Sequence, residues 1–412
     1  MKRRTVIKAL AGITALVGIP YSLWRGVRYP RLSLETPPLK DSYSFEKTDL
    51  KFVDCFVTQN DKHHPNNENS NNTIFLRAFA PEPSIIIQQS AQARTLHLNN
   101  ISAEAKLTIQ NNSTIKEKID GINRIISIPA TQEEIVLNWT LPEYSSFEFA
   151  AIGDTGGAEE LEWCIHRAAE LNAKFFIHLG DFNYQDSDYD SAVQKFRNAP
   201  LPCYITIGNH DFHDNGLIVE KFLDDLGPLN NTFNVGNTRF VNIDTAASFL
   251  PVSGGKRAQM TKALIKDSHN YDDSVVFTHR SFYDPRPGED HDLGNVFEKD
   301  WFVKSLKAAN MYTLLAGHIH QFHDVESEGI RIIIAGQGLA HEDLIHQRQT
   351  AKMLIGNVSQ GQKVAYRTEP LSMPFNLHCH PHSSKWRKDN NDPFAEKINS
   401  LCEPIDARIN KA

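Results

Sequence analysis

Five short polar blocks, each placed just after an apolar run, constrain the fold of this chain more than any other feature. The blocks are rich in Gly, Asp, Asn, Tyr and His, and they occupy residues 153–156, 180–184, 208–211, 276–279 and 317–320. In open sheets of parallel strands, ligands bind at the edge where the strands' carboxyl ends meet. The sequence therefore predicts an α/β domain that gathers these five blocks at one edge.

The alternation of strands and helices begins at residue 147 and supports this class. Apolar runs predict strands at 147–152, 175–179, 204–207, 240–243, 275–277, 312–315 and 332–335. Helical stretches separate most of them, and a helix over 158–173 has an apolar stripe that includes Leu161, Ile165 and Ala168. This rhythm of strand and helix is typical of an α/β domain.

Residues 48–146 follow a different pattern. Short apolar alternations at 51–54, 73–77 and 134–139 are separated by turns rich in Asn, Ser and Pro. Several short strands with frequent turns predict a small β-sandwich of the immunoglobulin or fibronectin type. We interpret His63 and His64, beside an Asn-rich run, as part of a solvated loop.

Residues 1–28 have the composition of an export signal. Arg3 and Arg4 precede an apolar stretch over 9–24, which resembles a bacterial twin-arginine signal. A spanning helix needs about 20 apolar residues, and this stretch is shorter. No clear Ala-x-Ala cleavage site follows, so an uncleaved membrane anchor stays open as an alternative. An ordinary secretory signal is the other alternative. We expect an exported protein, periplasmic or at the cell surface, with a linker over 29–47.

Composition disfavours two classes of partner and leaves the pairing of the cysteines open. The formal net charge of −7 disfavours nucleic acid and anionic membranes as partners. The odd number of cysteines leaves at least one unpaired within the chain. They are Cys55, Cys164, Cys203, Cys379 and Cys402. We expect buried thiols at Cys164 and Cys203, and interpret 366–412 as a polar tail, with a histidine-rich segment at 378–382.

The polar blocks supply carboxylate, amide, phenol and imidazole groups but no thiolate. That mixture suits two close cations of the iron, zinc or manganese type better than a tetrahedral structural zinc. Two close cations repel each other, and a bridging carboxylate offsets part of that repulsion. Asp181 is the candidate bridge, and Asp154 would bind one ion. His318 and His320 lie two residues apart, so they could approach different ions.

Taken together, the five blocks resemble those of the calcineurin-like metallophosphoesterase superfamily. Many members begin with Asp-x-His, and here Gly156 occupies the histidine position. The purple acid phosphatases also lack that histidine and supply a tyrosine from Gly-Asp-x-x-Tyr, which is Tyr184 here. The chain is therefore similar to this subgroup and unlike the protein serine/threonine phosphatases. The resemblance spans about 147–340 and implies a four-layer αββα sandwich, for which we expect the bounds 147–365.

The resemblance also implies a set of site residues. A ferric ion would be held by Asp154, Asp181, Tyr184 and His320. A divalent iron, zinc or manganese ion would be held by Asp181, Asn209, His279 and His318. Asn209 and His210 would contact the substrate, and His210 would also protonate the leaving group. In relatives a histidine of the loop after the fourth block touches the phosphate, and His291 is the candidate here. Arg280 is a comparable candidate, through bidentate contact with the phosphate.

These residues predict an exported acid phosphatase that hydrolyses small-molecule phosphate monoesters by attack of metal-bound hydroxide. A phosphodiesterase or nucleotide phosphatase with the same dimetal site is the alternative. A receptor or adhesin that binds metal without catalysis is disfavoured, because no expected ligand is missing from the blocks. The motifs leave the natural substrate, the second metal and the oligomeric state open.

Overall fold

The structure is a computed structural model of the chain. It describes residues 43–44, 50–58, 72–88, 92–111, 115–184, 188–212, 217–246, 255–293, 296–338 and 351–371. The predicted export signal, His63 and His64, Cys379, Cys402 and the segment 378–382 lie outside these residues. Among the helices described, none combines the length and the apolar character that crossing a bilayer requires.

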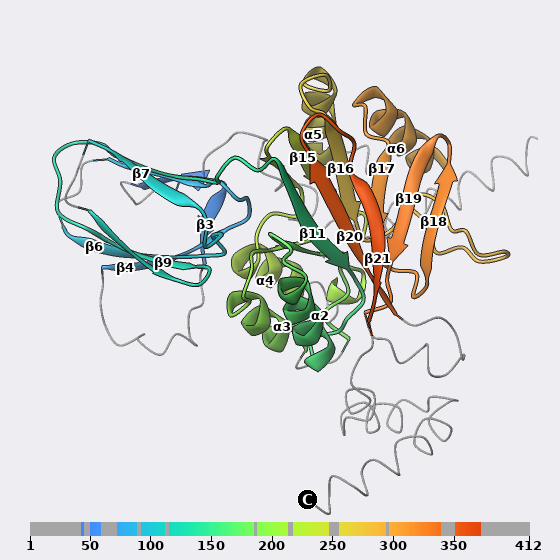
Figure 1. The fold of residues 1–412 in the computed structure, drawn as a ribbon, viewed down its shortest axis with the longest axis horizontal. Coiled ribbons are helices and arrows are strands. Elements are labelled where there is room, and N and C mark those ends of the chain that lie inside the picture. The colour runs from blue at the N-terminus through green and yellow to red at the C-terminus, as the bar shows by residue number, and fades with distance from the viewer. Residues whose placement is uncertain are drawn as a thin grey trace, which may run out of the picture.

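Two five-stranded sheets form the predicted β-sandwich at the amino-terminal side (Figure 1). One sheet has the order β1 (Tyr43–Ser44), β2 (Leu50–Val53), β5 (Ser84–Ile87), β10 (Ile135–Thr140), β7 (Lys106–Gln110). The other has the order β3 (Cys55–Val57), β4 (Thr73–Ala78), β6 (Arg94–Asn99), β9 (Asn123–Ile128), β8 (Lys116–Asp120). Alternate residues of β10, Ile135, Leu137 and Trp139, point into the shared core.

The α/β domain contains two further sheets. The first has the order β13 (Cys203–Ile205), β12 (Phe176–His178), β11 (Ser146–Ile152), β20 (Lys352–Ser359), β21 (Ala365–Pro370). The second has the order β14 (Asn231–Val235), β15 (Thr238–Asn242), β16 (Asp273–Thr278), β17 (Thr313–Ala316), β19 (Ile330–Ala335), β18 (Phe322–Ser327). Strands β11, β12 and β13 are parallel, as are β15, β16, β17 and β19.

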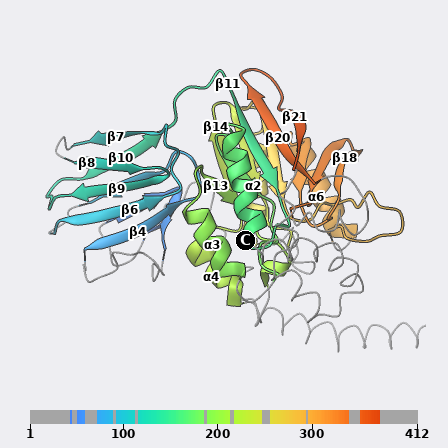
Figure 2. The same cartoon turned by 60° about the horizontal axis from the view of Figure 1, so that its bottom comes forward.

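Helices cover the outer faces of both sheets, which gives the predicted four layers (Figure 2). The first sheet is covered by α2 (Glu159–Glu170), α3 (Asp188–Arg197) and α4 (Leu217–Asp225), with the short η1 (His210–Phe212) beside them. The second sheet is covered by α5 (Gly255–Lys266) and α6 (Val296–Ala308). Between the sheets lies an aromatic core that includes Phe149, Phe175, Phe233 and Phe240. These layers confirm the predicted fold class.

The carboxyl-terminal boundary differs from the predicted one at residue 365. Strand β21 pairs antiparallel with β20 and continues to Pro370, and the Leu371 N–H then donates to Ala351 O at 2.7 Å. This strand looked like the beginning of a polar tail because it lies at the edge of its sheet and none of its residues is fully buried. An edge strand exposed in this way lacks the apolar alternation from which strands are recognised.

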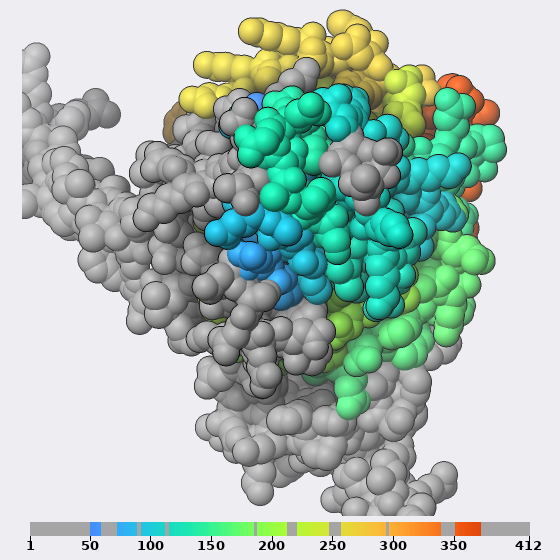
Figure 3. All heavy atoms as spheres, turned by 90° about the vertical axis from the view of Figure 1, so that its left-hand side faces the viewer, coloured from blue at the N-terminus to red at the C-terminus, as the bar shows by residue number. Residues whose placement is uncertain are grey.

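The sandwich contacts the α/β domain at the free edge of β13. Asn100 accepts a hydrogen bond from the Cys203 N–H at 2.8 Å and donates one to the Cys203 carbonyl at 3.1 Å. Arg77, also buried, donates to the same carbonyl at 3.1 Å. Figure 3 shows the blue and teal surface of the sandwich in front of the α/β domain, whose visible parts are green, yellow and red. The strand that leads into the third polar block is therefore held from the sandwich side.

Candidate metal centre

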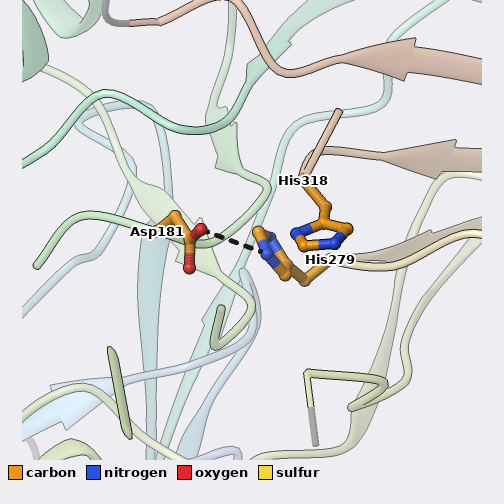
Figure 4. Close-up of side chains that lie close together, drawn as sticks. All are labelled: Asp181, His279 and His318. Atoms are coloured by element: carbon orange, nitrogen blue, oxygen red, sulfur yellow. Dashed lines mark ion pairs between the residues drawn. The ribbon is translucent and has the colours of Figure 1, made fainter. Parts of the chain in front are cut away.

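The polar blocks meet where strands of both sheets end. Asp154 follows β11, Asp181 follows β12 and His318 follows β17, and His279 comes directly after β16. One ligand atom each from Asp181, His279 and His318 lies within 4.8 Å of the others. Figure 4 shows the Asp181 carboxylate facing the His279 ring, with His318 beside it. The edge predicted from the sequence thus holds a cluster of metal-ligating groups.

Three of these residues have an unusual backbone conformation. Asp154, Asp181 and His318 have φ angles of 61°, 60° and 67°. Residues other than glycine rarely adopt positive φ, and such strain is concentrated at functional sites. The turn at His318 directs its N–H to Asp154, with distances of 2.9 Å to Oδ2 and 3.1 Å to Oδ1. The strained backbone therefore ties the first block to the fifth.

The site has two halves, and His279 lies in the one that also contains Asn209 and His318, with Asp181 at its border. Its Nδ1 donates to the Leu179 carbonyl at 2.8 Å, because a carbonyl oxygen can only accept. Its Nε2 lies 2.9 Å from Asn209 Oδ1 and 3.3 Å from Asp181 Oδ2. Burial alone would lower the pKa of His279, but the Asp181 and Asp154 carboxylates raise it to about 9. The site thus favours a positive charge at His279 Nε2, where a cation would bind.

His318 completes this half. Its Nε2 atom is buried and has no hydrogen-bond partner among the described residues. Burial, reinforced by the charge of His279, holds the pKa of His318 far below its ordinary value. A neutral imidazole has a lone pair on one nitrogen, and leaving a buried polar atom unpaired is costly. A metal ion would satisfy that nitrogen, so this donor set fits a cation.

Tyr184 and His320 form the other half. The Tyr184 hydroxyl lies 3.2 Å from His320 Nε2 and 3.4 Å from Asp181 Oδ2, while His320 Nε2 lies 3.3 Å from Asp154 Oδ1. Ligand atoms about 2.0–2.2 Å from one ion stand about 3 Å apart in octahedral coordination. Asp181 Oδ2 is shared with the half that contains His279. The residues therefore fit two cations bridged by one carboxylate.

Asp211 holds the loops of the site, a role that sequence reasoning missed. Its buried carboxylate accepts hydrogen bonds from the N–H groups of Gly208 at 2.6 Å, Phe182 at 3.0 Å and Asp181 at 3.1 Å. Burial and the nearby charge of Asp181 raise its pKa to about 8. Asp211 is the last residue of the third block, but two of its three partners, the N–H groups of Asp181 and Phe182, belong to the second block, and no spacing in the sequence reveals that contact.

His178 is packed inside the domain, as the sequence indicated. Its Nδ1 accepts the Gly180 N–H at 3.2 Å, so its ring proton is on Nε2, which lies 2.9 Å from Thr155 Oγ1. Burial lowers its pKa to about 3, so the ring is neutral. His178 therefore joins the first two blocks without being a ligand candidate.

The candidate substrate residues lie around the two halves. The His210 N–H donates to Asp181 Oδ1 at 2.8 Å, and its ring centroid is 4.6 Å from that of Tyr184. The His291 ring centroid lies 5.5 Å from that of His318. Burial lowers the pKa of Arg280, which also feels the charge of Asp181. His210 and His291 thus lie beside candidate metal ligands, and Arg280 follows His279 directly in the chain.

Asp284 organises the loop that contains His291. Burial alone would raise the pKa of its carboxyl group, but hydrogen bonds from Arg286 and from the His291 N–H lower it from 3.8 to about 2. A carboxyl group with a depressed pKa stabilises the folded state fully above its unfolded pKa, and that contribution is lost as the pH falls through about 2. The loop should therefore keep its structure in moderately acidic solution.

We expect an NMR titration to show this directly. The carboxyl carbon of Asp284 should titrate with a midpoint near 2 in the wild type, and the midpoint should move toward 3.8 in Arg286→Met, which lacks the guanidinium. An unchanged midpoint in the variant would contradict the ion pair as the cause of the shift. Glu104, whose carboxylate bonds to Lys174 at 2.6 Å outside the loop, is the internal reference.

Comparison with known proteins points to one family. Residues 147–322 match the family model described as calcineurin-like phosphoesterase. A search of curated proteins gives no match to the chain.

Several solved structures are similar to this chain at low sequence identity. The GAP50 anchor of the inner membrane complex of Plasmodium is 13% identical, with a TM-score of 0.41 over 55% of this chain and 85% of its own. A dimetal phosphatase from Danio rerio is 13% identical, with a TM-score of 0.40 over 54% and 96%. A purple acid phosphatase from yellow lupin seeds is 11% identical, with a TM-score of 0.46 over 70% of each chain.

Proposed function

We propose that this chain is an acid phosphatase of the purple acid phosphatase type, because residues 147–322 match the model of the calcineurin-like phosphoesterase family, whose members hydrolyse phosphoric esters at dimetal centres. Its substrates would be small-molecule phosphate monoesters. The observation that carries the proposal is the position of Tyr184, whose hydroxyl lies beside both His320 and the shared carboxylate of Asp181. A phenol at that position offers a hard anionic ligand, which suits a ferric ion.

The two halves of the site would hold two different ions. Fe(III) would bind to Asp154, Asp181, Tyr184 and His320, and a divalent iron, zinc or manganese ion would bind to Asp181, Asn209, His279 and His318. When bound, the ions would neutralise phosphate charge and lower the pKa of a coordinated water. The first set contains three anionic groups, if the tyrosine is ionised, whereas the second contains one. This difference in ligand charge favours the higher-valent ion in the first set.

The remaining side chains would act on the ester itself. Arg280 would contact phosphate oxygens, since its buried Nε has no hydrogen-bond partner among the described residues. His210, next to Asn209 and with its ring beside that of Tyr184, would donate a proton to the departing alcohol. His291, whose ring lies beside that of His318, would donate a hydrogen bond to the phosphate from that half of the site.

We also propose that the protein is exported to the periplasm or the cell surface. The support is the pair Arg3 and Arg4 ahead of an apolar stretch, which resembles a twin-arginine signal. That route carries folded proteins, so a metal centre assembled inside the cell could be exported intact. Cell fractionation of a wild-type strain and of an Arg3→Lys, Arg4→Lys strain tests it: export of the variant at the wild-type level would refute the twin-arginine route.

The metal proposal is tested by the visible spectrum and by elemental analysis of the purified protein. We expect about two metal ions per chain, at least one of them iron, and a broad visible band from charge transfer between tyrosinate and ferric iron. In Tyr184→Phe this band should disappear or shift. Tyr144→Phe is the matched control, because Tyr144 donates to Glu104 at 2.6 Å outside the site.

A colourless protein with two zinc or manganese ions would contradict the ferric assignment but leave the phosphoesterase in place. Turnover of 4-nitrophenyl phosphate and of bis(4-nitrophenyl) phosphate then measures the ester preference. Faster hydrolysis of the diester would replace the acid phosphatase proposal with a phosphodiesterase.

A further inference from the structure

The loop after His279 contains two arginines with different surroundings. The loop is closed at its base, where the Leu293 N–H donates to the Ser281 carbonyl at 2.8 Å. Arg280 precedes this closure, and Arg286 lies inside the loop together with His291. The resemblance to known phosphatases assigns no role to Arg286, so its contacts have to indicate one.

Arg286 is joined to Asp284 by a two-point ion pair. Its Nε donates to Asp284 Oδ1 at 3.0 Å and its Nη2 donates to Oδ2 at 2.8 Å. The Arg286 N–H also donates to Oδ1, and the His291 N–H donates to Oδ2, each at 3.0 Å. The Asp284 side chain is only 2% exposed. One buried carboxylate therefore fixes both the guanidinium and the backbone of His291.

The same guanidinium determines the tautomer of His291. Arg286 Nη2 lies 2.6 Å from His291 Nδ1. A guanidinium can only donate, so Nδ1 must accept, and the ring proton is on Nε2. The ring also lies beside His318, with the two centroids 5.5 Å apart. The loop thus fixes the backbone of His291 and makes Nε2 the protonated nitrogen of its ring. This ring lies beside His318, at the candidate metal centre.

We propose that Arg286 and Asp284 are positioning residues that fix His291 so that its Nε2–H donates to a phosphate oxygen of the substrate. The inference rests on the proposed phosphatase function and adds to it a determinant of phosphate binding. Because Arg286 is neutralised by Asp284 and bonded to His291, it acts through His291 rather than by binding phosphate itself. Arg280, whose Nε is buried without a partner among the described residues, contacts the phosphate directly.

A double-mutant cycle with Arg286→Met and His291→Ala tests this division of roles. The readouts are kcat and KM for 4-nitrophenyl phosphate, and the Kd of inorganic phosphate measured by calorimetry on the metal-loaded full chain. Outer partners that orient a functional histidine are typically worth about 10- to 100-fold. We expect about a tenfold loss in kcat/KM and a weaker phosphate affinity for Arg286→Met, with the metal content unchanged.

In the His291→Ala background, Arg286→Met should cause no further loss, since it acts only through the missing ring. Independent, multiplicative losses would overturn the proposal and make Arg286 a direct phosphate ligand. Arg331→Met is the matched control, because Arg331 makes the same kind of two-point ion pair with Asp324, at 2.9 and 2.8 Å. Arg331 lies near the amino-terminal end of β19, whereas the site lies at the carboxyl ends of the strands. This variant should leave kcat/KM and phosphate affinity unchanged.

The tautomer gives a readout that is independent of turnover. In zinc-loaded protein, which is diamagnetic, the ¹⁵N spectrum of His291 should show Nδ1 unprotonated and Nε2 protonated, and Arg286→Met should lose this preference. A protonated Nδ1 in the wild type would overturn the inference. Failure of the proposed function would look different, since wild-type protein would then neither turn over the ester nor bind phosphate.

Discussion

Asp181→Asn should lose both metal ions and at least about a thousandfold in kcat/KM, since a dimetal centre supplies several kcal/mol of transition-state stabilisation. The substitution keeps the shape of the side chain and removes its charge. Asp181 Oδ2 is the atom shared by the two halves, 3.4 Å from the Tyr184 hydroxyl and 3.3 Å from His279 Nε2. Burial raises the pKa of Asp181, but His279 holds it below its ordinary value, so the side chain that would bridge the ions is ionised.

Elemental analysis, together with steady-state kinetics at saturating metal, measures this result. Asn209→Ala is the comparison, because Asn209 contacts His279 at 2.9 Å and belongs to one half only. That variant should lose affinity mainly for the divalent ion and keep the iron. An Asp181→Asn protein with two ions and full activity would disprove the bridging role.

Gly208→Ala should have the second-largest effect. A Cβ atom at this position would overlap both the backbone N and the Oδ1 of Asp181, so the loop or the bridging carboxylate must move. Gly208 does not have a left-handed backbone, so the conflict is one of space alone. Since a misplacement of about 1 Å can cost about a hundredfold in rate, we expect a loss of at least that size, with weaker metal retention.

Gly329→Ala is the control for this substitution. Gly329 has a φ of 73°, and a Cβ there would meet nothing within 4 Å, so the change imposes backbone strain without a collision. It should lower the unfolding free energy by about 1–2 kcal/mol and leave kcat/KM unchanged. Thermal denaturation and metal analysis of both variants separate the two causes. Normal metal content and activity in Gly208→Ala would show that the loop adapts.

The parts of the fold that depend on periodic burial could be predicted from the sequence. The strands that precede Asp154, Asp181 and His279 are almost fully buried, so they are visible as apolar runs. Strand β21 is exposed along most of its length, and its sequence gives no comparable signal. The N-terminal sandwich was recognisable because alternate residues of strands such as β10 are buried.

The site could be predicted only in part, because its contacts join distant segments. Tyr184 and His320 are 136 residues apart, and no rule of spacing brings them together. Their pairing was implied by resemblance to a known family. Asp211 and Asp284 were not assigned roles, since each acts on backbone N–H groups whose positions depend on loop conformation. Such groups can be identified only once the turns are known.

The contact between the sandwich and β13 has a consequence for the behaviour of the α/β domain in solution. Asn100 offers the Cys203 backbone one donor and one acceptor, as a neighbouring strand would. An open strand edge is the surface through which sheets of different molecules pair and aggregate. Because side chains of the sandwich occupy this edge, we expect the α/β domain to be less prone to pair through β13 with the sheets of other molecules than the domain without its sandwich.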